Sequence, residues 1–492
     1  MSTESKKPEE KKEEKPAPKD NLVQSKHSVK IGGKEVKYTV TAGTMVLKEE
    51  YIDKDKDTDV EKARAQIFFI AYIRDGLKDK AKRPVTFSFN GGPGSSSVWL
   101  HMGVLGPRRV VLTDDGELPP PPFKLTDNQY SLLDETDLVF IDPMGTGYSR
   151  PVEGEKARDW HTFKKDIESV GDFIRLYVTR YNRWLSPKFL AGESYGTTRA
   201  AGLSGYLQER HGMYLNGLIL VSVVLDFTTI DFNLNNELPY ILFLPGYAAT
   251  AWYHGKLKFK IPLQTLLQEG EEFAQGPYAA ALFKGDSLSL DERTHIVDKL
   301  SRYTSLSKEF IERTNLRIID RHFFKELLRE RGRTIGRLDS RFTGIDRSGV
   351  TETHEYDPLL TNVLGPYTAA FYDYVRTELK FESDLPYEIL SEKAGANWTY
   401  SQFENQYLNV AETLRKAMTY NKYLKVFVAN GYYDLGTPYC ATEYTFNHLG
   451  LDESLRENVS MEYYDAGHMM YIHLPSLKEM KKDLTKFIKD AS

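Results

Sequence analysis

The segment Lys188-Phe-Leu-Ala-Gly-Glu-Ser-Tyr-Gly-Thr-Thr198 places Ser194 at the centre of the pentapeptide Gly192-Glu-Ser-Tyr-Gly196. Apolar residues lead into the pentapeptide, and a helix-compatible segment, residues 197–209, follows it. This order predicts a strand, a sharp turn and a helix, because glycines beside the serine admit the crowded backbone of a nucleophile elbow. The serine hydroxyl would then stand at a helix N-terminus, where developing negative charge is stabilised. The pentapeptide by itself is equally typical of an ordinary glycine-rich turn, so the rest of the chain must distinguish the two.

The composition of the 492-residue chain is that of a globular protein, with 40% hydrophobic and 27% charged residues. This length allows two or three domains, or one large α/β domain with an insertion. A formal net charge of −5 gives no reason to expect nucleic acid as a partner. No apolar run reaches the roughly 18 residues of a membrane span, so no transmembrane segment is expected.

Two further features of the sequence bear on the compartment of the protein: a single cysteine and a charged N-terminal segment. Cys440 is the only cysteine, which excludes an intramolecular disulfide and fits a reducing compartment or an export route without disulfides. Residues 1–26 are rich in Lys, Glu and Pro with balanced charge, which predicts a disordered tail. They contain no apolar signal core, so the sequence as written predicts a cytoplasmic protein, or a periplasmic or secreted one if a leader was removed.

Strand and helix patterns alternate on both sides of Ser194. Before it come a predicted hairpin in residues 27–50 and short apolar strands near residues 65–73, 83–90 and 137–142. After it come a buried strand in residues 215–225, later strands near residues 424–430 and 460–464, and an amphipathic helix in residues 474–491. This alternation predicts an α/β fold with a mostly parallel central sheet flanked by helices.

The alternation stops between residues 227 and 397. Long amphipathic segments replace the strand patterns there, which predicts a mainly helical cap inserted into the α/β unit. The expected domains are therefore a tail, residues 1–26, an α/β core, residues 27–226 and 398–492, and a cap, residues 227–397.

A nucleophilic serine needs a base and a group that orients the base. In the order typical of this kind of sheet, the acid follows a later strand and the histidine comes last. Asp434 follows the strand that ends at Asn430, and His468 follows the strand that ends near Tyr464. Each lies in a glycine-containing loop, where parallel sheets present functional groups. Alone, Asp434 could cap its loop and His468 could be an ordinary loop histidine; their joint order favours a Ser194–His468–Asp434 triad.

The oxyanion of an acyl-transfer reaction needs two backbone donors. One is expected to be the N–H of Tyr195, directly after the serine. The other is expected from the loop Asn90-Gly-Gly-Pro-Gly94, with Gly92 as donor, because glycines let this loop approach the substrate closely.

Five ordered sequence blocks resemble the serine carboxypeptidase family, a branch of the α/β-hydrolase fold. The blocks are Asn90-Gly-Gly-Pro-Gly-Ser-Ser96, Asp142-Pro-Met-Gly-Thr-Gly-Tyr-Ser149, Gly192-Glu-Ser-Tyr-Gly196, Gly431-Tyr-Tyr-Asp434 and Gly467-His-Met469. The resemblance spans about residues 83–226 and 424–471 and is interrupted where the family carries a helical cap. It implies a serine-type carboxypeptidase that removes C-terminal residues of peptides through an acyl-enzyme.

In this family the residues matching Asn90 and Glu193 hold the substrate's terminal carboxylate. A glutamate can bind a carboxylate only when one of the two carries a proton, which predicts activity favouring acid pH. Two positions depart from the family pattern. Val104 stands where a second glutamate is usual, and Ser95 stands in place of the usual cysteine, which indicates a bacterial-type member without disulfides.

Two other functions share these motifs. An acyltransferase or esterase of the same fold would use the same acyl-enzyme, and a binding protein could keep the fold without catalysis. No phosphate-binding or dinucleotide fingerprint is present, and the histidines lack a recognised ligand spacing, so no cofactor and no metal are expected. Peptides with a free C-terminus are the expected partners, and the oligomeric state stays open.

Overall fold

The computed structural model describes residues 18–53 and 58–492. The predicted disordered tail lies outside the described residues as far as residue 17. Its predicted end at Lys26 is wrong, because strand β1 (Asn21–Ile31) begins inside it. All of β1 pairs antiparallel with β2 (Lys34–Asp53), from Asn21↔Thr44 to Ile31↔Lys34, and these backbone hydrogen bonds order residues 21–26. The same pairing confirms the predicted hairpin.

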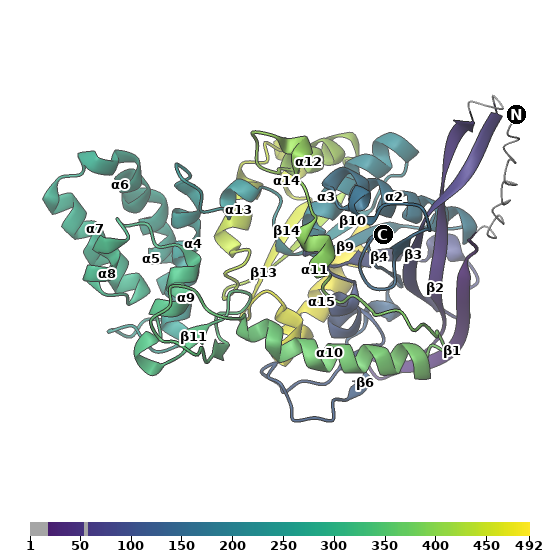
Figure 1. Ribbon diagram of the computed structural model, residues 1–492, viewed down its shortest axis with the longest axis horizontal. Helices are drawn as coiled ribbons and strands as arrows, with labels where there is room; N and C mark the ends of the chain where they lie inside the picture. The colour runs from purple at the N-terminus through teal and green to yellow at the C-terminus, as the bar shows by residue number, and fades with distance from the viewer. Residues whose placement is uncertain (1–17, 54–57) are drawn as a thin grey trace, which may run out of the picture.

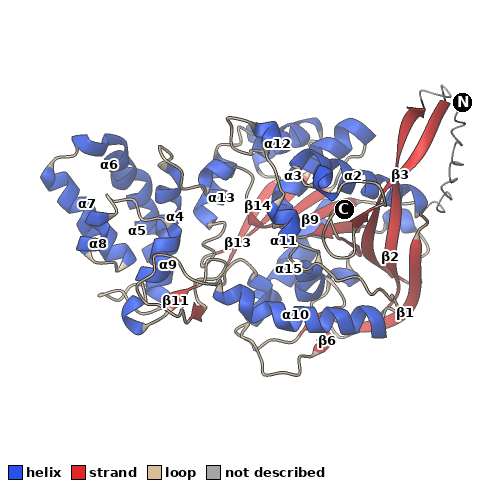
Figure 2. Ribbon diagram, in the orientation of Figure 1, coloured by secondary structure: helices blue, strands red, loops and turns tan. Residues whose placement is uncertain are grey.

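A large sheet runs through the molecule in the order β1-β2-β3-β7-β4-β9-β10-β13-β14, with β8 paired to β3 (Figure 2). The strands from β7 onward run parallel to one another, and β1, β2 and β3 add antiparallel neighbours. The remaining strand bounds are β3 (Thr58–Arg74), β4 (Val85–Phe89), β7 (Asp137–Ile141), β8 (Arg150–Pro151), β9 (Lys188–Ser194), β10 (Gly217–Val223), β13 (Lys425–Gly431) and β14 (Val459–Tyr464). The predicted mostly parallel sheet is confirmed.

Helices cover both faces of the sheet. Successive residues of a strand point to opposite faces, so neighbouring residues pack with different helices. Leu190 and Leu218 pack with helices α2 (Phe163–Arg180), α3 (Tyr195–His211) and α12 (Ala411–Tyr420). Their neighbours Phe189 and Ile219 pack on the other face with α10 (Pro358–Thr377) and α15 (Leu474–Ala491). In the described part of the chain, no helix is both long and apolar enough to cross a membrane.

A helical lobe projects from one end of the sheet, at the left of Figure 1. It has its own apolar core and consists of α4 (Leu238–Tyr253), α5 (Leu263–Phe273), α6 (Ala279–Lys284), α7 (Leu290–Thr304), α8 (Lys308–Arg313) and α9 (Asp320–Glu326). Strands β11 (Thr334–Ile335) and β12 (Thr343–Gly344) pair where the chain leaves the lobe. We use "helical lobe" below for residues 238–335.

The predicted cap, residues 227–397, thus divides between two apolar cores. Its first part forms the helical lobe, but α10 packs on the sheet through residues such as Leu359 and Phe371. The segment after α10 also joins core loops, through bridges such as Ser95↔Leu390. A cap ending near residue 344 describes the packing better than the predicted end at residue 397, because α10 lacks an apolar partner in the lobe. Short elements complete the fold: α1 (Val98–Leu100), α11 (Glu392–Ala396), α13 (Tyr439–Asn447), α14 (Glu453–Arg456), β5 (Arg108–Val110) and β6 (Leu125–Asp127).

Candidate active site

Ser194 occupies a strained turn between β9 and α3. Its φ of 60° and ψ of −131° lie outside the regions that non-glycine residues normally adopt. The turn is crowded, since a Cβ on Gly192 would lie 2.1 Å from the carbonyl oxygen of Gly196. Ser194 is partly exposed, whereas Glu193 and Tyr195 are buried. The predicted strand–turn–helix is therefore present, and it holds the serine at the N-cap of α3.

His468 and Asp434 meet beside this turn. Strands β9, β10, β13 and β14 are parallel neighbours, so the loops that follow them gather at one edge of the sheet. His468 Nδ1 lies 2.7 Å from Asp434 Oδ2, and both side chains are buried. Ser222 on β10 donates a 2.7 Å hydrogen bond to the His468 carbonyl, next to the Val223↔Ser194 pair. The three predicted triad residues are thus brought to one place.

The Asp434 carboxylate is held by its own loop. Oδ1 accepts from the N–H groups of Gly436 (2.8 Å) and Thr437 (3.0 Å), and Oδ2 accepts from Thr437 Oγ1 (2.8 Å). Burial disfavours the charged imidazolium, but the Asp434 carboxylate outweighs it and raises the pKa of His468 above its ordinary value. No hydrogen bond joins the Ser194 and His468 side chains; such bonds are often long in enzymes without substrate. The arrangement suits a base whose tautomer is set by an aspartate.

The loop Asn90–Gly94 lies directly on the elbow. A Cβ on Gly91 would come within 2.4 Å of the Tyr195 nitrogen, so only glycine allows this approach. Tyr195 is the first residue of α3, and its N–H has no partner within the helix. Gly92, with a φ of 102°, donates no loop hydrogen bond. The loop thus lies against the segment that carries the Tyr195 N–H, as expected if Gly92 and Tyr195 are the two donors of an oxyanion site.

A buried ion pair holds the loop Asn90–Gly94 through the carbonyl of Asn90. Arg199 on α3 donates to Asp166 on α2 (2.8 Å) and to the Asn90 carbonyl (2.5 Å). The Arg199 and Asp166 side chains are only 1% and 3% exposed. The sequence reasoning missed this pair, because the two residues are 33 positions apart and neither lies in a recognised motif.

Asn90 and Glu193, the two residues predicted to hold a substrate carboxylate, lie close together, and we call this pair with its contacts the carboxylate site. Asn90 Oδ1 accepts from Leu100 N (3.1 Å), while its buried amide nitrogen makes no well-formed hydrogen bond. That amide still lies near enough to Glu193 to lower its pKa. Burial dominates, however, and raises the pKa of Glu193 to about 7. Tyr471 donates a 2.6 Å hydrogen bond to Glu193 Oε2, a contact that the sequence reasoning missed.

A segment next to the helical lobe ties the two catalytic loops together. Residues 337–341, which we call the brace segment, accept backbone hydrogen bonds from Leu435 N (3.0 Å, to the Arg337 carbonyl) and His468 N (2.7 Å, to the Leu338 carbonyl). Asp339 Oδ2 accepts from Gly467 N at 2.9 Å, and Arg341 neutralises this buried carboxylate. The brace segment thus fixes the residues beside Asp434 and His468. No sequence pattern pointed to it.

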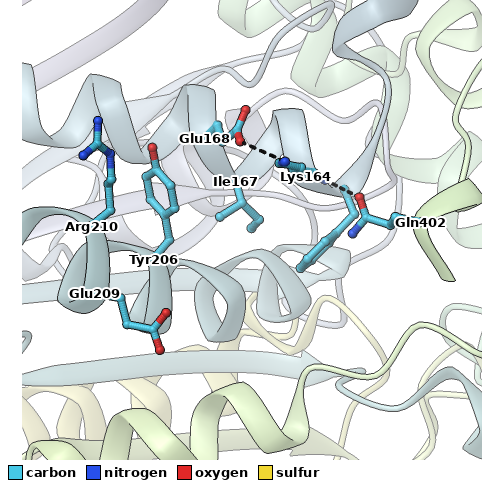
Figure 3. Close-up of a pocket in the computed structure, with 8 residues that line it drawn as sticks. Lys164, Ile167, Glu168, Tyr206, Glu209, Arg210 and Gln402 are labelled. Carbon is cyan, nitrogen blue, oxygen red and sulfur yellow. Dashed lines mark hydrogen bonds and ion pairs between the residues drawn. The ribbon is translucent and has the colours of Figure 1, made fainter.

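A separate surface groove of about 600 Å³ lies between α2 and α3 (Figure 3). Its lining residues are Phe163, Lys164, Ile167, Glu168, Tyr206, Glu209, Arg210 and Gln402. Tyr206 lies twelve positions beyond Ser194 on one helix, which is roughly 18 Å of helix rise. The groove is therefore distinct from the catalytic edge of the sheet.

One cluster among the described residues offers metal-ligand types. The ligand atoms of Glu271, Cys440 and Glu443 lie within 4.8 Å of one another. Tyr439 and Tyr463 already donate hydrogen bonds to the two carboxyls. Burial raises the pKa of all three groups, which favours their protonated forms, whereas metal binding requires deprotonated ligands. We assign this cluster no metal role.

Comparison with known proteins gives one consistent family. A family model described as serine carboxypeptidase matches residues 49–472. The pheromone-processing carboxypeptidase KEX1 of Saccharomyces cerevisiae is 33% identical over 161 residues, which cover 31% of this chain and 20% of KEX1. Serine carboxypeptidase-like 33 of Arabidopsis thaliana is 27% identical over 164 residues, 31% of this chain and 30% of that protein.

The fold comparison agrees with the sequence comparison. The crystal structure of yeast Kex1, a prohormone-processing carboxypeptidase, superposes with a TM-score of 0.53 and 18% identity over 91% of each chain. At this identity the similarity establishes the fold, which is that of an α/β hydrolase. The sequence alignments, by contrast, span only 20% and 30% of the length of these two curated relatives.

Proposed function

The chain belongs to the serine carboxypeptidase family, and we propose that it hydrolyses the C-terminal peptide bond of peptides through an acyl-enzyme. One observation carries the proposal. Directly before the candidate nucleophile stands a buried acid, Glu193, whose pKa of about 7 lets it hold a proton near neutrality. Beside it, Asn90 has an amide nitrogen without a well-formed hydrogen bond. Together they are suited to a peptide's terminal carboxylate.

In the proposed acylation, Ser194 Oγ attacks the carbonyl carbon of the last peptide bond. His468 Nε2 takes the hydroxyl proton, while Asp434 holds Nδ1–H and stabilises the imidazolium. The N–H groups of Gly92 and Tyr195 hold the oxyanion. The C–N bond then breaks, and His468 gives its proton to the leaving amine, which departs as a free amino acid.

Deacylation repeats these steps with water. His468 takes a proton from water, the hydroxide attacks the Ser194 ester, and the proton returns to Ser194 Oγ as the shortened peptide leaves. The placement of the triad at the carboxyl edge of the parallel strands supports both steps, because His468 serves each in turn.

The carboxylate site gives the proposed reaction its pH dependence. Substrate carboxylates are charged throughout the working range, so Glu193 must carry the shared proton. Binding should be strong below a pH of about 7 and weaken as Glu193 loses its proton above it. Glu193 and His468 interact, so the observed limbs belong to the pair and not to one residue.

The test is incubation with a mixed peptide library from about pH 4 to pH 8, followed by mass spectrometry of the products. The expected products are C-terminal ladders that disappear in Ser194→Ala. Ser204→Ala is a matched control, since the hydroxyl of this buried α3 serine bonds only the Ala201 carbonyl among the described residues and lies ten positions from the elbow. Internal or N-terminal cleavage would contradict the proposal.

An esterase or acyltransferase would share the triad but would not need the carboxylate site. Peptides with a free C-terminus should therefore be cleaved faster than the same peptides ending in an amide, because only the former engage Asn90 and Glu193. Equal rates would favour the esterase or acyltransferase. Failure of a fluorophosphonate to label Ser194 would favour a binding protein without catalysis.

A further inference from the structure

Tyr471 makes a hydrogen bond to the carboxylate site, and the proposed reaction steps assign it no role. It lies three positions after His468, in the 3-10 turn Met470–Ile472. Its hydroxyl donates to Glu193 Oε2 at 2.6 Å, and both side chains are buried. This is the only hydrogen bond that the Tyr471 hydroxyl makes with the described residues.

The neighbouring backbone is shaped around the Tyr471 ring. A Cβ on Gly103 would lie 2.4 Å from Tyr471 Cε2 and 2.8 Å from the Tyr367 hydroxyl, so glycine leaves the space that the ring fills. The next residue, Val104, is fully buried, and its side chain offers no polar group. At this position the family resemblance leads one to expect a second glutamate as partner for Glu193. A phenol from a different loop therefore supplies the hydrogen bond.

We propose that Tyr471 is the positioning residue of the carboxylate site. By holding Glu193 Oε2 as an acceptor, it directs the acid's proton to Oε1, the oxygen left to meet the carboxylate of a bound peptide. This role rests on the proposed function, because it assumes that Glu193 binds a terminal carboxylate.

The chemistry of a phenol differs from that of a second carboxylic acid. Burial and the Glu193 charge keep the pKa of Tyr471 well above its ordinary value, so its hydroxyl remains a donor throughout the working range. Two carboxyl groups would share one proton and could place it on either partner. With Tyr471 as the partner, a single proton on Glu193 is enough for the site to bind a carboxylate, and that proton lies on Oε1.

Other groups around Glu193 act on the same equilibrium. His468 and Asn90 lower its pKa and Asp434 raises it, while Tyr367 on α10 lies close enough to sense its charge. The hydrogen bond from Tyr471 stabilises the charged carboxylate and so lowers the Glu193 pKa. Removing the Tyr471 hydroxyl alone should therefore extend carboxylate binding to higher pH, although the proton is then less well placed.

The experiment measures kcat and KM for a C-terminal peptide from pH 5 to pH 9 in Tyr471→Phe. The alkaline limb of kcat/KM should move up by about one pH unit, since lost hydrogen bonding to the charged form raises a carboxyl pKa. At pH 6, KM should rise about tenfold with kcat within about twofold, because terminal-carboxylate binding and not chemistry is affected. Hydrolysis of the matching peptide amide should not change.

Tyr177→Phe is the matched control, because it also removes a buried tyrosine hydroxyl, but one on α2 that has no hydrogen-bond partner among the described residues. Its profile should equal that of the wild type. In Glu193→Gln the alkaline limb should vanish, and adding Tyr471→Phe should shift nothing further. If Tyr471→Phe does not fold, 3-fluorotyrosine at position 471 keeps the shape, donates more strongly and should move the limb down.

Two results would overturn the inference. One is an unchanged alkaline limb in folded Tyr471→Phe, and the other is an equal loss of kcat/KM at every pH, which a merely structural role would cause. Either of these two results would leave the proposed function intact, provided that the wild-type protein still releases C-terminal residues from peptides. A wild type that releases none refutes the proposed function first.

Discussion

The central sheet and the brace segment meet at the candidate active site. The sheet carries Ser194 at the end of β9, whereas the brace segment, which lies next to the helical lobe, hydrogen-bonds the loops of Asp434 and His468. The sheet contributes side chains that can react, at the ends of adjacent parallel strands. The brace segment contributes mostly backbone, through hydrogen bonds to the loops of Asp434 and His468. Leu435, next to Asp434, is buried in the apolar core of the lobe. Under the proposed function, the sheet would supply the chemistry and the brace segment would supply its alignment.

The largest effect should follow a change on the sheet side. Asp434→Asn removes the charge that stabilises the His468 imidazolium, and kcat should fall by about 10⁴-fold. Steady-state kinetics on a chromogenic peptide checks this, with thermal unfolding to verify the fold. A loss below about tenfold would show that Asp434 does not orient His468 and that the orienting residue lies elsewhere.

A change in the brace segment should have a smaller effect on kcat. Asp339→Asn leaves Arg341 without its buried partner and weakens the hold on Gly467, so misaligned His468 should lower kcat by about 10–100-fold. The unfolding free energy should fall by about 3 kcal/mol. Kinetics and urea denaturation measure the two effects.

Asp346→Asn is the control for Asp339→Asn. Its side chain forms a second buried ion pair, with Lys325 of α9, but has no bond to a catalytic loop. Stability should fall by a similar amount of about 3 kcal/mol while kcat stays unchanged. Equal kcat losses in the two variants would show that the lobe acts through stability and not alignment.

Glu193, on the sheet side of the site, should make the free energy of unfolding depend on pH. Its pKa rises from 4.5 in the unfolded chain to about 7 in the folded one, so the folded state holds this proton more tightly. The resulting stability is fully present below pH 4.5 and is lost as pH rises through 7, by about 3 kcal/mol. Glu193→Gln should therefore lose this part of the pH dependence in urea denaturation from pH 4.5 to pH 8.

Glu404→Gln, an exposed change, is the control for that series and should follow the wild type at each pH. If Glu193→Gln and the wild type gave parallel stability curves, Glu193 would be ionised in the folded protein at acid pH. The carboxylate site would then need another proton source.

The smallest effect is expected in the lobe, far from the brace segment. Ser289 caps α7: its Oγ accepts from Glu292 N, and its own N–H donates to the Glu292 carboxylate, so Ser289→Ala should cost about 1 kcal/mol. Hydrogen exchange in α7 should quicken while kcat and KM stay at wild-type values. A change in kcat would mean that the lobe's internal stability, and not only the brace segment, governs alignment.

Local patterns carried much of the correct prediction. The elbow around Ser194 was predictable because strand, glycines and helix are adjacent in the chain, where steric rules act directly. Helix α15 buries five apolar residues, as the amphipathic pattern of residues 474–491 predicts: Leu477, Met480, Leu484, Phe487 and Ile488. Asp434 and His468 were predictable from strand order, since parallel strands bring their following loops to one edge.

The missed features all join distant parts of the chain. The Tyr471–Glu193 bond spans 278 positions, and Asp339 meets Gly467 across 128. Neither lies in a repeating pattern, because a single hydrogen bond needs only one donor and one acceptor at the right place. The place of α10 was missed for a related reason. Its amphipathic pattern shows that one face is buried but not against which surface.

The alternation of strands and helices, the elbow and the order of the candidate triad could all be read from the chain, since they depend on sequence neighbours and on strand direction. The surroundings of Glu193, the loops that the brace segment holds and the end of the lobe became visible only in the folded molecule. These depend on burial and on contacts across hundreds of residues. The pKa of about 7 at Glu193 exists only because folding removes its carboxyl from water.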